Sequence, residues 1–238
     1  MRHVLRFLGK LVLSLLALTA ALVLIVGAFF GIEGYNLYRA AVEEKPVEEL
    51  AASIREQDGF VSYDRLPQIY IDAVISAEDQ RFWTHSGVDF LAIGRALWHD
   101  LQTLSFAEGG STISQQLMKN QYFTQDKTLE RKFAEIFAAW KLEKTYTKQE
   151  IFEMYVNTIY FGSGYYGIAQ AAEGYYGKEP EELTDYEAVM LAGLPNAPSA
   201  YALDTNLELA RQRMDQVLER MVDCGKLTAA EAAALASP

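Results

Sequence analysis

The feature that most constrains this chain is a run of 22 residues, 11–32, that contains no charged side chain. As an α-helix with a rise of 1.5 Å per residue, the run would be roughly 33 Å long, enough to cross the hydrocarbon core of a bilayer. A cleaved signal peptide has a shorter apolar region of about 7 to 15 residues that ends at a small-residue site. We therefore expect residues 11–32 to form an uncleaved transmembrane anchor.

The residues before this run indicate its orientation. Arg2, Arg6 and Lys10 are basic, and loops on the cytoplasmic side of a membrane helix carry an excess of Lys and Arg. We therefore predict a single-pass protein of the cytoplasmic membrane with a cytoplasmic tail, residues 1–10. A juxtamembrane linker, residues 33–59, and all that follows would lie on the outer, periplasmic or extracytoplasmic face, where no nucleotide pool exists.

The composition excludes some classes of partner and site. A net charge of -11 over 238 residues argues against nucleic acid as a partner, because that binding depends on Lys and Arg meeting phosphates. Cys224 is the only cysteine, so neither an intramolecular disulfide nor a cysteine-based metal cluster can form. We expect Cys224 to pack at a helical position.

Local signals predict a mainly α fold without internal repeats. Glycines at 162, 164 and 167 favour a loop or short hairpin over residues 159–167, and Gly225 fits a left-handed end to a helix over residues 206–224. Pro195 and Pro198 end a helix that starts near Asp185. Capping boxes, each followed by an apolar-periodic run, occur at Thr112/Gln115, Thr147/Glu150, Thr184/Glu187 and Thr228/Glu231.

Positive charge is concentrated in one stretch of this acidic chain. Residues 111–148 carry seven Lys or Arg against four Asp or Glu, whereas the last 60 residues have a net charge of -7. A local basic patch is what the binding of a diphosphate requires. A solvated helix face would give the same count, so the charge alone does not decide between them.

The segment at residues 77–87 reads AEDQRFWTHSG and holds two adjacent carboxylates. If it is helical, Glu78, Phe82 and His85 lie at i, i+4 and i+7 on one face. A carboxylate beside aromatic rings is a candidate general acid or base. The alternative is a solvated helix start formed by Glu78 and Asp79.

The segment at residues 109–120 reads GGSTISQQLMKN. Two glycines followed by a capped helix start leave N–H groups at a positive dipole end, which is a site for anions. Lys119 follows one helical turn later. Further along, Arg131 and Glu135 are spaced to touch as an i, i+4 pair. The alternatives are an ordinary capped helix with surface lysines and an ordinary surface ion pair.

Five segments in order resemble the motifs of the peptidoglycan glycosyltransferases, glycosyltransferase family 51. The resemblance covers about residues 60–203, followed by a C-terminal helical segment, residues 204–238. It implies a lysozyme-like helical head with a small membrane-proximal jaw, which we place at residues 90–106 with Tyr122 and Phe123. The segments are AEDQRFWTHSG, GGSTISQQLMKN, RKFAEIFAAWKLEKTYTKQEIFEMYVNTIYFG, YGIAQAAEGYYGK and LTDYEAVMLAGLPNAPSAY.

The resemblance also implies an activity. Family members polymerise lipid II into β-1,4-linked glycan strands with inversion and with release of a polyprenyl diphosphate. The growing lipid-linked strand is the donor and lipid II the acceptor. The implied partners are therefore lipid II, the lipid-linked glycan, membrane lipid and wall-synthesis transpeptidases.

Roles for individual residues follow from the motif match. Glu78 would be the general base, with Asp79, Phe82 and His85 shaping its surroundings. Glu135 would be a second acidic residue that orients the basic side chains or helps a divalent cation, Mg or Mn, to hold the diphosphate. The donor diphosphate would be bound by Lys119, Lys127 and Arg131, with Ser111, Thr112, Gln115, Gln116 and Asn120 completing the donor site.

The departures from the family pattern are small. Tyr176 stands where members often have Phe, and Ala202 and Leu203 stand where a proline is common. No Ser-x-x-Lys tetrad of a transpeptidase occurs, so we expect the monofunctional type or the front part of a longer chain. Two alternatives remain: a lysozyme-like hydrolase or lytic transglycosylase acting on finished glycan, and an inactive wall-synthesis scaffold.

Overall fold

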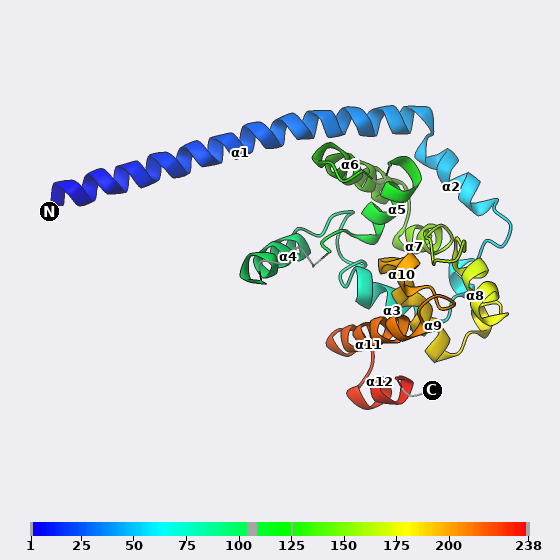
Figure 1. The fold of residues 1–238 in the computed structure, drawn as a ribbon. Helices are drawn as coiled ribbons and strands as arrows, with labels where there is room; N and C mark the ends of the chain where they lie inside the picture. Colours follow the sequence, from blue (N-terminus) through cyan, green and yellow to red (C-terminus); the bar gives the residue numbers. More distant parts are fainter. Residues whose placement is uncertain (1, 104–108, 125, 237–238) are drawn as a thin grey trace.

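The computed structural model describes residues 2–103, 109–124 and 126–236, and the described chain is mainly helical (Figure 1). An isolated antiparallel bridge joins Tyr160 to Tyr166. The predicted mainly α fold is confirmed. The α-helices are α1 (Arg2–Glu44), α2 (Val47–Arg55), α3 (Gln68–Glu78), α4 (Phe90–Thr103), α5 (Ile113–Tyr122), α6 (Leu129–Thr145), α7 (Lys148–Val156), α8 (Ile168–Tyr176), α9 (Asp185–Gly193), α10 (Pro198–Tyr201), α11 (Leu207–Asp223) and α12 (Ala229–Leu235), with 3-10 turns η1 (Tyr63–Arg65), η2 (Pro180–Glu182) and η3 (Leu194–Asn196).

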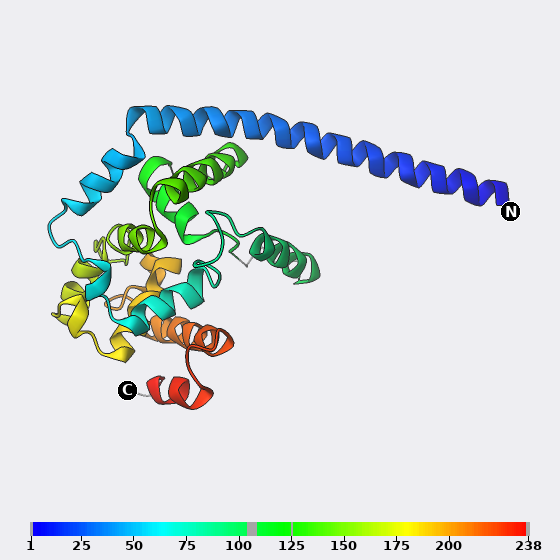
Figure 2. The same ribbon diagram turned by 180° about the vertical axis from the view of Figure 1, so that it is seen from behind.

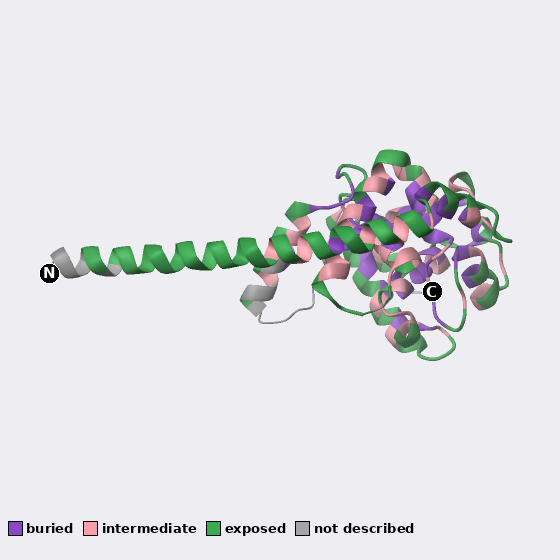
Figure 3. Ribbon diagram, turned by 90° about the horizontal axis from the view of Figure 1, so that it is seen from above, coloured by how far each residue is buried: buried purple, intermediate pink, exposed green. Residues whose placement is uncertain are grey.

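The first helix is continuous through the predicted anchor and well beyond it. Its apolar part is long enough and apolar enough to cross a membrane, and it is exposed along this length (Figure 3). Its C-terminal part packs along α6, and Pro46 then separates it from α2. Because a proline ring excludes its predecessor from helical geometry, the break falls at Lys45. Residues 33–44, expected as a linker, are therefore helix.

The packed core extends beyond the range 60–203 on both sides. Val47, Leu50 and Ile54 of α2 are buried in the same apolar cluster as Met214 and Val217 of α11. The predicted linker and C-terminal segment thus contribute helices to the domain itself. The core therefore spans α2 to α11.

A central helix, α3, carries the cleft described below. It packs against α9 and α11, which also pack against each other, with Tyr70, Ile71 and Val74 buried. Helices α5, α6 and α7 pack together. Figures 1 and 2 show α4 at one edge of the domain, on the side toward which the N-terminal half of α1 runs.

The predicted helix ends are confirmed. All four capping boxes are present with both reciprocal hydrogen bonds. Gly225 adopts a φ of 68°, which ends α11 in the left-handed conformation, and Cys224 is the half-buried residue before it. Pro195 and Pro198 follow the end of α9. These features depend on a few neighbouring residues, which is why the sequence predicts them.

The predicted jaw is described only in part. Phe90, Leu91 and Trp98 of α4 are exposed by 66%, 68% and 63% of their surface. Residues 104–108 and the side chains of residues 97 and 101 lie outside the described part of the chain. Tyr122 and Phe123, by contrast, are half-buried and pack against the core. The exposed apolar surface expected of the jaw is therefore found on α4.

Candidate functional site

A cleft of about 370 Å³ opens where the C-terminal end of α3 meets α4, the start of α5 and α11. Its wall includes charges of both signs and the glycines that precede α5. The residues that line it include Glu78, Ser111, Gln116, Lys119, Arg213 and Arg220.

Glu78 is the last residue of α3 and faces this cleft. Its Oε2 accepts a hydrogen bond of 2.8 Å from Gln116 Nε2, and its Oε1 lies 3.5 Å from Arg213 Nη2. Its side chain keeps about 10% of its surface exposed. The carboxylate is thus held by two groups while remaining accessible from the cleft.

The helix stops at Glu78, so the predicted single face of Glu78, Phe82 and His85 was wrong. Asp79 has φ -157° and ψ 73°, outside the helical region, and the following residues form turns. Phe82 is fully buried against Phe152 and Trp83. The helix ends here because the Asp79 carboxylate binds groups from other segments, His85 and the Ile113 amide.

Asp79 and His85 form a buried pair that supports the site. Asp79 Oδ2 lies 2.8 Å from His85 Nε2 and accepts a hydrogen bond from the Ile113 amide at 3.0 Å. Because Lys148 Nζ lies 3.4 Å from His85 Nδ1, that nitrogen is the acceptor and Nε2 carries the proton toward Asp79. The pair ties the residue after Glu78 to the start of α5, and its predicted effect on the surroundings of Glu78 stays a prediction.

The start of α5 is anchored by the protein's own groups. Thr112 Oγ1 accepts from the Gln115 amide and donates to the Gly87 carbonyl, and Gln115 Oε1 accepts from the Thr112 amide. Because the Asp79 carboxylate accepts the hydrogen bond of the Ile113 amide, part of the predicted anion site is already occupied by the protein itself. Gln115 is fully buried and has a structural role, whereas Ser111, Thr112 and Gln116 reach the cleft.

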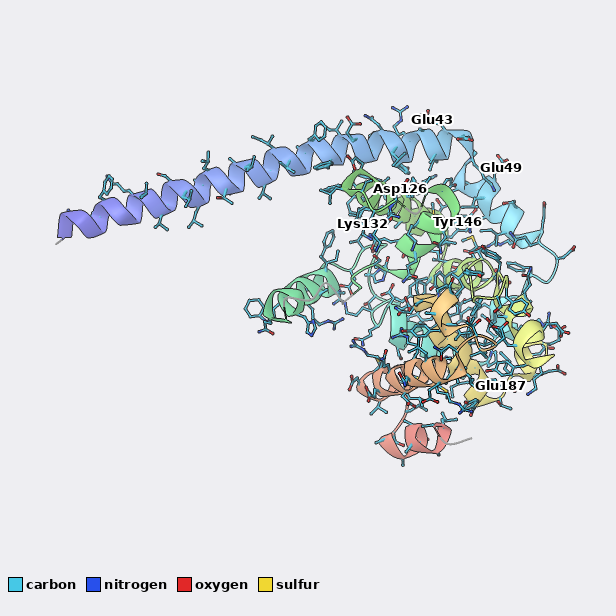
Figure 4. All side chains as sticks on the ribbon, viewed as in Figure 1. Glu43, Glu49, Asp126, Lys132, Tyr146 and Glu187 are labelled. Atoms are coloured by element: carbon cyan, nitrogen blue, oxygen red, sulfur yellow. The ribbon has the colours of Figure 1, made fainter. Side chains whose placement is uncertain are left out.

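A cluster of two cations and one buried carboxylate lies on α6. Glu135 Oε1 lies 3.2 Å from Arg131 Nε, and its Oε2 accepts from Lys132 Nζ at 2.8 Å. Lys132, labelled in Figure 4, also donates to Ser111 Oγ at 2.6 Å. This bond ties α6 to the cleft wall. The predicted contact between Arg131 and Glu135 is confirmed.

Lys119 interacts electrostatically with charged groups on both sides of the site, Glu78 and the α6 cluster. It lines the cleft from α5. Burial lowers the pKa of its ammonium group below the ordinary value. The positive charges of Arg131 and Lys132 also lower this pKa, whereas the negative charge of Glu135 raises it. A cation that is partly stripped of water and repelled by its neighbours gains more from an anionic ligand than a solvated lysine does.

Comparison with known proteins decides the family. A family model described as Transglycosylase matches residues 43–222, the span from the end of α1 to the end of α11. This chain belongs to the transglycosylase family. That assignment agrees with the resemblance of its five motifs.

Relatives of this transglycosylase include both long and short proteins. Penicillin-binding protein 1A of Aquifex aeolicus is 45% identical over 71% of this chain and 23% of its own length. A Cupriavidus necator protein named as a transglycosylase is 39% identical over 81% of this chain and 83% of its own. The crystal structure of penicillin-binding protein 1A from Haemophilus influenzae covers 75% of this chain and 17% of its own, with 26% identity and a TM-score of 0.45. The chain thus spans about a quarter of the Aquifex protein.

The structure does not bring every predicted residue of the transglycosylase to the cleft. Lys127 and Asn120 are exposed and lie outside its wall, and Arg131 of α6 also lies outside it. Three basic residues, Lys132, Arg213 and Arg220, were missed by sequence reasoning. The two arginines lie seven residues apart beside the buried stripe of α11, so helical spacing could have placed them together.

The chain's own groups do not form a resident metal site in the described residues. No three His, Cys, Asp or Glu side chains there come together as ligands. Glu135 turns both carboxylate oxygens to Arg131 and Lys132. Of the two roles predicted for Glu135, this geometry favours orienting the basic side chains. A requirement for Mg or Mn remains a prediction. Such an ion would be held chiefly by the phosphates of the substrate.

Proposed function

We propose that this transglycosylase polymerises lipid II into β-1,4-linked glycan strands, using a lipid-linked strand as donor. The observation that carries the proposal is the position of Glu78. It is a carboxylate held at the edge of the cleft by Gln116 and Arg213, while Lys119 lines the same cleft. A base and a cation within one cleft suit a displacement with an anionic leaving group.

The reaction needs one base and one anion site. The acceptor 4-hydroxyl oxygen forms a bond to the anomeric carbon of the donor while the bond from that carbon to the diphosphate oxygen breaks. The hydroxyl proton passes to the Glu78 carboxylate, and the bonding electron pair leaves with the polyprenyl diphosphate. Attack opposite the leaving group inverts an α-linked donor to a β-1,4 product.

The cations supply the second half of the mechanism. Negative charge grows on the diphosphate as the anomeric bond breaks, and fixed positive charge lowers that barrier without a protein acid. We assign this role to Lys119, Arg131 and Lys132. Glu135 holds Arg131 and Lys132 in place, because its buried carboxylate contacts both.

The membrane placement of the reaction is also a proposal. The apolar part of α1 would cross the cytoplasmic membrane with its N-terminus inside, and the exposed apolar side chains of α4 would meet the outer leaflet. Such a position would present the cleft to lipid-linked substrates. Protease added to intact spheroplasts is expected to digest the domain, and full protection would contradict this orientation.

The direct test is polymerisation of purified lipid II in detergent, with and without a chelator. Growth of lipid-linked strands supports the proposal, and its loss on chelation would show a metal requirement. Lipid-free glycan strands form the second arm. Their shortening, without growth from lipid II, would identify a hydrolase or lytic transglycosylase instead, and inactivity in both arms would indicate a scaffold.

A further inference from the structure

A second cavity of about 260 Å³ lies between the C-terminal end of α2 and the start of α8. Its wall includes the side chains of Gln57, Asp58, Tyr166 and Gln170. The reaction proposed above uses none of them. In Figures 1 and 2, α8 lies at the end of the domain opposite α4 and far from the N-terminal half of α1.

Tyr166 gives this cavity an exposed aromatic surface. Outside α1 and α4 it is the most exposed aromatic residue in the described chain, at 56%. Its ring packs at a tilt against the Tyr160 ring, with a centroid distance of 4.7 Å and an interplanar angle of 31°. The Tyr166 ring is therefore supported by a neighbouring ring while more than half of the residue remains exposed.

The backbone around Tyr166 is fixed by its neighbours. Its amide donates to Gln170 Oε1 at 3.0 Å, and the Gly167 amide donates to the Ile159 carbonyl at 2.8 Å. Gly167 has a φ of 81°, and a Cβ there would lie 2.6 Å from the Asn157 carbonyl oxygen. The Tyr166 ring thus stands on a rigid turn that only glycine permits, which lowers the ordering cost of binding.

We propose that this cavity binds sugar units of a β-1,4-linked N-acetylhexosamine strand. A pyranose ring presents C–H groups on one face, which pack on an aromatic ring, and hydroxyl and amide groups at its rim. Gln57 and Asp58 offer planar donors and acceptors for that rim, beside the Tyr166 ring. This choice of polymer rests on the proposed function.

The position of the cavity suits a growing strand. It lies away from the elements assigned to the membrane, so the lipid-linked end of a strand would not reach it. Lipid-free sugars further along the strand would reach the cavity. Binding there would hold the product on the enzyme between additions, and its loss would release shorter strands.

The experiment measures binding of a β-1,4-linked N-acetylglucosamine tetramer to the full chain in detergent. It is done with the main cleft free and with that cleft filled by a phosphoglycolipid donor mimic. Tyr166→Ala is expected to weaken the binding about five- to tenfold, because it removes a stacking surface. Tyr166→Phe keeps the ring and is expected to bind like the parent. Thermal melting of both variants checks the fold.

Three results would overturn the second site: no binding by the parent, binding abolished by the donor mimic, or equal binding by the parent and Tyr166→Ala. Lipid II turnover by the parent is measured separately, so failure here is distinct from failure of the proposed function. Tyr166→Ala is expected to start strands at the parental rate and to release shorter products. Products of parental length would also count against the site.

Discussion

Two carboxylates near the cleft differ in their surroundings, and the difference separates the roles that we propose for them. Glu78 ends a helix, accepts one amide hydrogen bond and lies 3.5 Å from one guanidinium. Glu135 sits within a helix, is almost fully buried and contacts both Arg131 and Lys132. An accessible carboxylate can receive a proton from substrate, whereas a carboxylate enclosed by two cations serves as their counter-charge.

The same contrast extends to the elements that hold them. Glu78 depends on α3, which packs against α9 and α11 in the core. Glu135 depends on α6, which packs between the anchor helix and α5. We therefore expect changes on the α3 side to affect proton transfer, and changes on the α6 side to affect binding of the diphosphate and stability.

The largest effect is expected for Glu78→Gln. Glutamine keeps the shape and can still contact Gln116, but it cannot accept the proton of the acceptor hydroxyl. Turnover of lipid II should fall by about 100- to 10,000-fold, the usual contribution of a general base. Affinity for a donor mimic and the melting temperature should stay close to those of the parent. Turnover near the parental rate would remove Glu78 from this role.

Glu135→Gln, unlike Glu78→Gln, should lower both the stability of the fold and the affinity for the donor mimic. The substitution leaves Arg131 and Lys132 without their buried counter-charge, so the free energy of unfolding should fall by about 2–3 kcal/mol. Affinity for the donor mimic should fall as well, because the two cations lose their orientation. Glu181→Gln, which breaks an exposed pair with Arg65, is the matched control and should cost less than about 1 kcal/mol. Loss of turnover with unchanged donor affinity would move the base to Glu135.

Gly34→Val tests how the anchor braces the α6 side. A Cβ at Gly34 would lie 2.7 Å from the Glu130 carbonyl oxygen and 3.0 Å from the Ala134 amide nitrogen, so a larger side chain must separate the two helices. We expect a loss of about 1–3 kcal/mol in unfolding free energy, typical of overpacking, and weaker donor-mimic binding. Gly31→Val is the control, because nothing lies within 4 Å of a Cβ there. Equal effects of both substitutions would show that the contact does not position α6.

The sequence predicts some of these features and not others. Helix caps such as Thr112 with Gln115 depend on residues three apart, and the motif resemblance placed Glu78 and Glu135 near one site. The end of α3 was not predictable, because it depends on Asp79 meeting His85 and Ile113 from other segments. Arg213 was missed for the same reason: α11 reaches Glu78 only through the packing of α3 against α11.

The smallest effect is expected for Lys119→Met, and its sign depends on pH. Burial lowers the pKa of Lys119 in the folded chain, whereas the unfolded chain keeps the ordinary value of 10.5. Below the folded pKa, folding therefore carries the cost of a charged, partly buried ammonium group, and this cost disappears as the pH rises toward 10.5. Methionine removes it.

Lys119→Met should therefore melt at a higher temperature than the parent at neutral pH, with a gain that shrinks as the pH approaches 10.5. Lys127→Met, at an exposed position, is the control and should show no such dependence. The Lys119 variant should also bind the donor mimic more weakly, because it loses a cation of the cleft. A more stable protein with a weaker donor site would show that Lys119 is retained for the ligand at the expense of the fold. A lower melting temperature at neutral pH, or donor affinity equal to that of the parent, would contradict this assignment.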